Sequence, residues 1–304
     1  MTIGTASGFT NALYEAGLLF STGVPGLPGR SGQFEAVLAG LDALITRLGS
    51  DNWAEVMRFP PAMNRAAFEK TGYMRAFPQL AGSIHCFCGD ERAHRALLAC
   101  IGEGRDWTDG LAPAETVLTP AACYPLYPTG AGRGPLPPQG ATIDVASWCF
   151  RHEPSEDPAR MQMFRMREYV RIGAPDQVLA FRQHWLDRVP EIAAALGLSA
   201  ATDLANDPFF GRAGQLKADS QREQGLKFEM LVQAGDGPKP TACMSFNYHQ
   251  DLFGTMCGLR QSDGAVAHTG CVGFGMERLT LALFHRHGLQ LPAWPAAVRH
   301  ALDL

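Results

Sequence analysis

Cationic, acidic and aromatic side chains gather around one expected β-hairpin. Arg151 and Glu153 end its first strand, and Arg160, Phe164 and Glu168 follow a polar loop on the returning side. Side chains at even spacing along a strand project to the same face. Such a face offers a planar guanidinium for phosphate, a carboxylate for an amine or a base edge, and an aromatic plane for a purine. Cross-strand ion pairing on a solvated sheet is the alternative, and the hairpin alone does not decide between the two.

A glycine-rich turn into a helix is the second candidate. Gly273 and Gly275 permit close approach of the backbone to a ligand, and Arg278 lies in the first helical turn. A cation there opposes the helix dipole, so helix stability does not account for it. The free N–H groups of a helix N-terminus suit phosphate. A tight strand-to-helix turn without a ligand remains the alternative.

Cys123, Glu168 and Cys271 form the third candidate set. Two thiols and a carboxylate are zinc-ligand types, but these residues lie far apart in the sequence and give no metal-binding spacing. The chain has eight cysteines and no Cys-x-x-Cys pair. A free cysteine is ordinarily a small apolar core residue, and each of the two cysteines taken alone is expected to be one.

Apolar periodicity predicts the elements that position these residues. Two β-prone stretches form the hairpin, two more strands flank a Gly-Pro turn, and a last strand leads through the two glycines into a helix. An earlier helix starts after Ser31 and stops at Gly49. The other expected elements are strands 142–152, 163–171, 226–233, 241–248 and 264–272, and helices 176–197 and 276–287.

Prolines and glycines crowd the segment 123–140, which reads CYPLYPTGAGRGPLPPQG. Proline donates no backbone hydrogen bond, so we expect neither a helix nor a central strand here. Long loops in compact domains are usually functional or disordered. The aromatic and cysteine content of this loop favours function.

Composition limits the class of protein. The chain has 304 residues, of which 46% are hydrophobic and 18% charged, with 26 basic and 30 acidic residues and a formal net charge of −4. These values indicate a globular protein of one large domain or two small ones, and the acidity argues against wholesale nucleic-acid binding. Nothing marks a domain boundary except the helix-rich segment at about 174–225, so we expect a single domain over 1–304 with that segment as an insertion. No apolar run is long enough for a membrane helix. The N-terminus does not resemble a secretory signal, so we expect a cytoplasmic protein.

The three candidate sets occur in an order that is similar to a known family. Arg-x-Glu, a loop, Arg-xxx-Phe-xxx-Glu and then Gly-x-Gly-x-Glu-Arg resemble motifs 2 and 3 of class II aminoacyl-tRNA synthetases. Phe59-Pro60-Pro61 occupies the position of motif 1, and 242–251 resembles the segment before motif 3 in seryl-tRNA synthetases. The resemblance covers roughly 50–290. It implies an α+β fold, with an antiparallel sheet of six or seven strands flanked by helices, and a homodimer formed through motif 1.

Two departures narrow the resemblance. Only about 50 residues precede motif 1, too few for a tRNA-binding arm, and no separate anticodon-reading domain is seen. A core of this kind resembles the amino acid:[carrier protein] ligases, which are related to the zinc-dependent seryl enzymes of methanogens. That resemblance implies activation of a small amino acid, glycine or alanine, by ATP to an aminoacyl-adenylate. The acceptor would be the phosphopantetheine thiol of a carrier protein rather than tRNA.

The resemblance also implies roles for the candidate residues. Cys123, Glu168 and Cys271 would hold one zinc ion per subunit, with an open position for the unprotonated α-amino group of the substrate. Ser245 and Asn247 would line the amino acid pocket, which Glu153 would also help to form.

ATP with Mg²⁺ would bind beside that pocket. Arg151, Glu153 and Arg278 are the expected catalytic residues, with Arg151 on the α-phosphate and Glu153 on the adenine amino group or the substrate. Arg160 and Arg278 would hold the β- and γ-phosphates, and Phe164 and Arg278 would sandwich the adenine. The other expected ATP contacts are Met161, Ala242 and Ser245.

The implied carrier proteins are acidic, so a basic docking patch is expected on this acidic chain. The segment 211–227 combines four basic with two acidic side chains. A solvated helix face is the alternative interpretation of such a run. The residues are Arg212, Lys217, Arg222 and Lys227 against Asp219 and Glu223.

Two other functions remain open. A truncated seryl-type synthetase acting on tRNA would share these motifs, but the missing arm and the net acidity argue against it. A non-catalytic paralogue that serves as a regulatory subunit would have no need to keep the phosphate ligands Arg151, Glu153 and Arg278.

Overall fold

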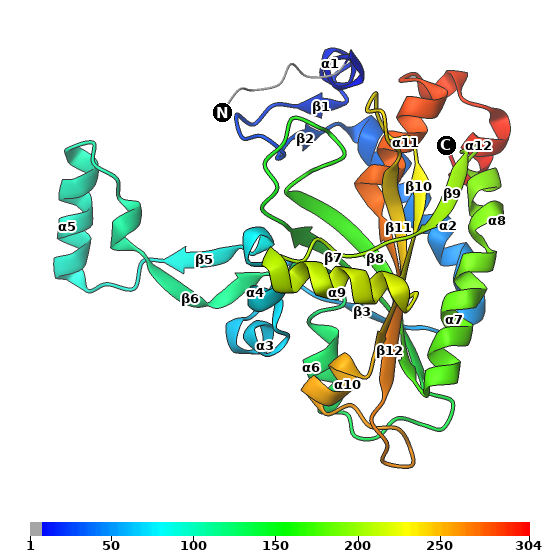
Figure 1. Cartoon of the computed structure of the whole chain (residues 1–304). Helices are drawn as coiled ribbons and strands as arrows, with labels where there is room; N and C mark the ends of the chain where they lie inside the picture. Colours follow the sequence, from blue (N-terminus) through cyan, green and yellow to red (C-terminus); the bar gives the residue numbers. More distant parts are fainter. Residues whose placement is uncertain (1–7) are drawn as a thin grey trace.

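A seven-stranded mixed sheet forms the centre of the molecule (Figure 1), in the order β3-β7-β8-β12-β11-β10-β9. It is seen in a computed structural model that describes residues 8–304. Only the β3–β7 pair is parallel. The strands are β3 Glu55–Arg58, β7 Ala141–Phe150, β8 Met163–Gly173, β9 Ala200–Leu204, β10 Lys227–Val232, β11 Thr241–Gln250 and β12 His268–Gly275. This sheet, flanked by helices, confirms the expected α+β class.

The β7–β8 hairpin is the longest pairing in the sheet. Phe150 pairs with Met163 at the loop end and Ala141 with Ile172 at the open end, in the antiparallel arrangement that the two β-prone stretches predicted. Arg151 and Glu153 lie just beyond the last residue of β7, in the loop that joins the two strands. The hairpin therefore holds this loop at the edge of the sheet.

The two faces of the sheet are covered differently. Tyr169 and Phe274 project to the face that α2, α7 and α11 cover, where both rings pack against Trp185. Val170 and Cys271 project to the opposite face, against α6 and α10. The helices are α1 Gly8–Glu15, α2 Gly32–Leu48, α3 Arg65–Lys70, α4 Tyr73–Ala76, α5 Glu91–Gly102, α6 Leu126–Ala131, α7 Pro175–Asp187, α8 Val189–Ala195, α9 Gly211–Glu223, α10 Leu252–Cys257, α11 Met276–His287 and α12 Ala296–Ala301.

Two helix predictions need correction. The proline-rich segment 123–140 contains the six-residue helix α6, because Pro128 lies in its first turn, where no N–H partner is needed. The single helix expected over 176–197 is two helices, α7 and α8. Pro190 cannot donate the hydrogen bond that would continue α7, so the helix ends at Asp187.

The structure also contains an arm that the sequence did not predict. Strands β4 Ala62–Asn64, β5 Ser83–Cys86 and β6 Ala112–Leu118 form a separate three-stranded sheet, which carries α5 at its end. Figure 1 shows this arm extending away from the rest of the molecule. No residue of α5 is buried.

The segment 174–225 is rich in helix, with α7, α8 and α9, but it also supplies β9. This strand pairs with β10 and forms one edge of the main sheet. None of the helices within residues 8–304 is both long enough and apolar enough to cross a membrane.

Candidate active site and metal centre

One cavity of about 850 Å³ brings together nearly all the residues singled out in the sequence. It lies on the face of the sheet that carries α6 and α10, and α4 and α9 contribute to its wall. The predicted residues that line it are Cys123, Arg151, Glu153, Met161, Phe164, Glu168, Ala242, Ser245, Asn247, Cys271 and Arg278. Arg160 does not line it; its side chain is 57% exposed and lies 3.6 Å from the Glu153 carboxylate.

Strand pairing explains why distant residues meet at this cavity. Glu168 on β8 pairs with Gly273 on β12, which in turn pairs with Ser245 on β11. Two residues before Gly273 on β12, Cys271 pairs with Asn247 on β11. Because alternate residues share a face, the register sets these side chains in one patch on the cavity floor.

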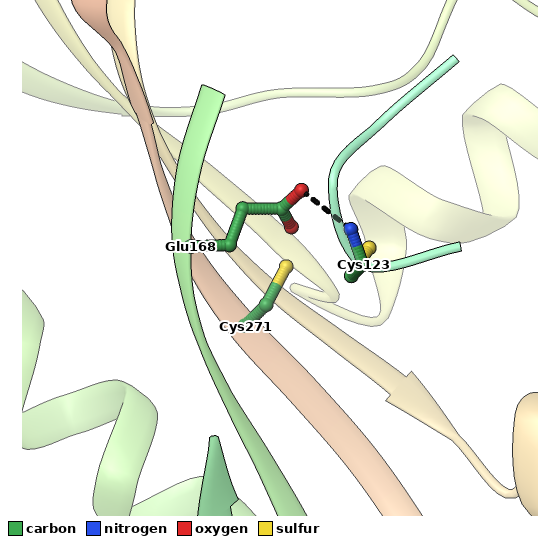
Figure 2. A group of neighbouring side chains, drawn as sticks. All are labelled: Cys123, Glu168 and Cys271. Carbon is green, nitrogen blue, oxygen red and sulfur yellow. Dashed lines mark hydrogen bonds between the residues drawn. The ribbon is translucent and has the colours of Figure 1, made fainter. Parts of the chain in front are cut away.

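Cys123, Glu168 and Cys271 form a compact group at the end of this patch (Figure 2), and their potential ligand atoms all lie within 4.8 Å of one another. Cys123 comes from the proline-rich segment, three residues before α6, and the two others come from neighbouring strands. All three are buried. The backbone N–H of Cys123 donates to Oε1 of Glu168 over 3.1 Å.

The electrostatics of this group suit a dication. Burial and the nearby Cys271 raise the pKa of Glu168 to about 8, and the hydrogen bond with Cys271 and burial raise the pKa of Cys123 well above its usual range. Hydrogen bonds from Cys123, His249 and Asn247 outweigh burial and lower the pKa of Cys271. Within residues 8–304, no lysine or arginine forms an ion pair with Glu168. Three acidic groups therefore lie close together. Such a set fits zinc, because two thiolates and one carboxylate can bind the ion and leave its fourth coordination position open.

Two arginines that hydrogen bonds hold in place also line the cavity. Arg278 donates from Nε to the carbonyl of Ala159 at 2.8 Å and from Nη1 to the carbonyl of Ala242 at 3.0 Å. Arg151 donates from Nε to a backbone carbonyl, and its guanidinium lies 5.4 Å from the ring centre of Phe164. Two preorganised guanidiniums beside an aromatic ring can bind a purine nucleotide with its phosphates.

Sequence analysis missed the segment that braces the motif 2 loop. The carbonyl of Gly26 accepts the N–H of Gln162 at 2.7 Å, and Nε2 of Gln162 donates to the carbonyl of Pro25 at 2.7 Å. Gly26 has φ +76°, and a Cβ there would lie 3.3 Å from the Gln162 nitrogen. Arg30 adds a hydrogen bond to the carbonyl of Met163. The glycines and prolines of 21–32 indicated a loop but not its partner.

Glu277, the acidic member of the motif 3 string, joins three elements. It accepts from the backbone N–H of Arg165 at 2.7 Å and from its Nε at 2.9 Å. The same guanidinium forms a bidentate pair with Glu35 on α2. This network ties β8, α11 and α2 together, and Glu277 itself lines the cavity.

One prediction about the basic segment 211–227 was wrong. Lys227 is not a surface cation: it is only 8% exposed and its Nζ lies 2.7 Å from Asp207 and 2.9 Å from Glu229. Gln221 on α9 completes the network through two hydrogen bonds with Asp207. Sequence spacing could not show that Lys227 is buried and Lys217 exposed. Lys227 is covered only because β10 pairs with β9 and β11 in the folded sheet.

Known proteins resemble this chain in sequence. No family model matches the chain. Over 287 residues it is 51% identical to amino acid–[acyl-carrier-protein] ligases 1 and 2 of Bradyrhizobium diazoefficiens, a match that covers 94% of this chain and 88% and 86% of those proteins. A type-2 serine–tRNA ligase of Methanococcus aeolicus is 28% identical over 195 residues, which are 60% of this chain and 36% of that protein.

Solved structures show the same fold at low identity. The seryl-tRNA synthetase of M. kandleri, crystallised with A. aeolicus tRNASec, superposes with a TM-score of 0.83 at 20% identity; the match covers 100% of this chain and 61% of that one. The seryl-tRNA synthetase of Pyrococcus horikoshii, complexed with ATP, gives a TM-score of 0.70 at 12% identity over 98% of this chain and 63% of its own. The expected class II synthetase fold is thereby confirmed. With its identity to the two Bradyrhizobium proteins, the chain belongs to the family of amino acid–[acyl-carrier-protein] ligases.

Proposed function

We propose that the protein activates glycine or alanine with ATP and transfers the aminoacyl group to the phosphopantetheine thiol of an acidic carrier protein. In the first step a carboxylate oxygen of the amino acid attacks the α-phosphorus, the bond to the β-phosphate oxygen breaks, and pyrophosphate leaves. In the second step the thiol sulfur attacks the adenylate carbonyl, loses its proton and expels AMP. Neither step needs a protein nucleophile, so positioning and charge stabilisation account for catalysis.

The observation that carries this proposal is the joint cavity. Arg151 and Arg278 line the same cavity as Cys123, Glu168 and Cys271, so an amino acid held at the three-residue group would have its carboxylate facing a nucleotide held by the arginines. Arg151 would stabilise the charge that develops on the α-phosphate.

Other residues would hold the nucleotide and its Mg²⁺. Glu153 would accept from the adenine amino group, with Phe164 and Arg278 on either side of the base. Arg160 would join the β- and γ-phosphates from the loop once ATP is present. The remaining ATP contacts would be Met161, Ala242 and Ser245.

The metal part of the proposal is a zinc ion held by Cys123, Glu168 and Cys271. Bound there, zinc would supply an open coordination position for the α-amino group of the substrate. Ser245 and Asn247 on β11, together with Glu153, would limit the room left for the amino acid. A small pocket of this kind suits glycine or alanine, which differ by one methyl group.

Two surfaces support the proposed partners. Trp53, just before β3, and Val56 within it are 93% and 64% exposed, and β3 is an edge strand of the main sheet. Exposed apolar side chains at an open sheet edge suit a homodimer through motif 1. Arg212 and Lys217 are exposed on α9 beside the cavity. They would attract the acidic carrier, although the patch is smaller than the sequence suggested because Lys227 is buried.

Pyrophosphate exchange with each of the twenty amino acids tests the activation step. We expect exchange with glycine or alanine alone. In a second assay, with the labelled amino acid, we expect transfer of the aminoacyl group to a phosphopantetheinylated carrier but not to tRNA. Charging of tRNA without charging of the carrier would overturn the acceptor assignment. No exchange with any amino acid would favour the non-catalytic alternative.

Zinc content tests the metal assignment separately. Cys123→Ser and Cys271→Ser should each lose the zinc that the unaltered protein holds at one ion per chain. Cys257→Ser is the matched control, because that half-buried thiol lies outside the group. Retained zinc and full activity in both site variants would refute the assignment.

A further inference from the structure

A histidine outside the three-residue metal group contacts one of its thiols. Nε2 of His249 lies 3.8 Å from Sγ of Cys271, and Nδ1 lies 3.1 Å from Oγ1 of Thr269. We propose that His249 is a positioning residue, which donates a hydrogen bond from Nε2 to the Cys271 thiolate and is oriented by Thr269. This inference rests on the proposed zinc site.

His249 is a partner of a ligand rather than a ligand itself. The ligand atoms of Cys123, Glu168 and Cys271 lie within 4.8 Å of one another, and His249 does not belong to that group. Its nitrogen faces the sulfur of Cys271 alone. Histidines and carboxylates that hydrogen-bond metal ligands commonly set the orientation and the electron density of those ligands.

The backbone departs from regular pairing at this residue. Tyr248 pairs with Gly270 and Gln250 pairs with Thr269, so His249 is the extra residue of a β-bulge in β11. Gln250 follows with φ +54°, a left-handed conformation that is uncommon for a residue with a side chain. Bulges frequently direct a side chain beside an active site, and this one leaves the His249 ring free to lie over Cys271.

The ring is also held by its surroundings. It meets the ring of Phe253 edge-on at a centroid distance of 5.1 Å, and that of Tyr127 at 6.3 Å. Thr269 is completely buried. Two aromatic rings therefore pack against the half-buried imidazole, and each of its ring nitrogens has one polar partner.

Chemistry fixes the direction of the hydrogen bonds. A metal-bound Cys271 is a thiolate and has no proton to give, so Nε2 of His249 must be the donor. With Nε2 as the donor, Nδ1 is the acceptor and takes the hydroxyl proton of Thr269. Asn247 donates a second hydrogen bond to the same sulfur at 3.4 Å. Hydrogen bonds from these two donors stabilise the negative charge on the thiolate sulfur and orient its lone pairs.

The test measures metal affinity rather than turnover. His249→Leu removes the donor, and loss of such a partner should weaken zinc binding about 10–100-fold in a competition with a chelator. His249→Gln keeps an N–H near the Nε2 position and should restore most of the affinity. Thr269→Val, which removes only the orienting hydroxyl, should give a smaller loss. His268→Leu is the matched control, because that ring bonds Tyr248 instead of Cys271.

Cobalt substitution separates this role from others. The thiolate-to-cobalt absorption of His249→Leu should keep the intensity of two thiolates and shift in energy, and the unfolding midpoint of the metal-free protein should not change. Unchanged zinc affinity and an unchanged spectrum would overturn the inference. Equal and complete metal loss in the Leu and Gln variants would make His249 a ligand and overturn it as well. If the unaltered protein binds neither metal, the proposed zinc site itself fails.

Discussion

Lys227 links the cavity wall to α9, and its removal should weaken the fold measurably. In Lys227→Met, the carboxylates of Asp207 and Glu229 lose a cation that lies 2.7 and 2.9 Å away. Breaking a buried ion pair from one side costs about 3–5 kcal/mol. The side chains of Asp207 and Glu229 are 33% and 21% exposed, so water can partly solvate them. We therefore expect a loss of about 3 kcal/mol at neutral pH, on the order of 150-fold in the unfolding constant.

The pH dependence of that loss has a definite sign. Burial would raise the pKa of Asp207, but Lys227 and Gln221 hold it below its usual value; burial would lower the pKa of Lys227, but Asp207 and Glu229 raise it. The stability from Asp207 is present above its unfolded-state pKa of about 3.9 and is lost as the pH falls through the folded value. The stability from Lys227 is present below about pH 10.4 and is lost as the pH rises through its folded pKa. The difference between the two proteins should thus be complete at neutral pH and shrink in acid.

Urea unfolding of the full chain at one protein concentration measures this difference at pH 7.5 and at an acid pH below the unfolded-state pKa of Asp207, about 3.9. Lys217→Met is the matched control, because that lysine is exposed on the neighbouring helix and should change stability by no more than about 0.5 kcal/mol. A loss below about 1 kcal/mol for Lys227→Met, or a loss that grows in acid, would refute the argument that the pair is buried and charged.

Three further predictions concern the site and its supports. Arg151→Ala should lower kcat/KM for pyrophosphate exchange about 10²–10³-fold, since a preorganised donor at a developing charge contributes on that order; an unchanged rate would remove Arg151 from the α-phosphate. Reversing the charges of Arg212 and Lys217 should slow transfer to the carrier far more than adenylate formation, and equal losses in both assays would count against docking at α9. Gly254→Ala should lower the thermal unfolding midpoint, because its Cβ would lie 1.9 Å from the carbonyl oxygen of Ala267 and such overpacking costs about 1–3 kcal/mol or more.

Local sequence patterns predicted several of the strands and helices. The β7–β8 hairpin and α11 follow from alternation, from helical periodicity and from the terminating Gly288, all of which act within a few residues. Motif order then placed Arg151 and Arg278 in one cavity. Arg151 follows the end of a strand and Arg278 lies in a first helical turn, so local backbone patterns were enough to bring both to the cavity. The roles assigned to them stay predictions.

The remainder depended on contacts that no local pattern encodes. Lys227 and Lys217 both belong to a charged stretch, and only tertiary pairing buries one of them. His249 gained its role from a bulge and from the neighbouring strand β12. The brace from Gly26 to Gln162 joins segments more than a hundred residues apart, and the arm that carries α5 has no buried helix face that periodicity could have indicated.

The strand order has a consequence for how the chain is made. β12 lies between β8 and β11, yet it is the last of the seven strands in the sequence. While synthesis proceeds from the N-terminus, β8 and β11 each present an open edge to which other chains can add. Cys271 and Arg278 arrive in the same late segment. A nascent chain therefore acquires its central strand together with Cys271 and Arg278, and until then the edges of β8 and β11 have no partner between them.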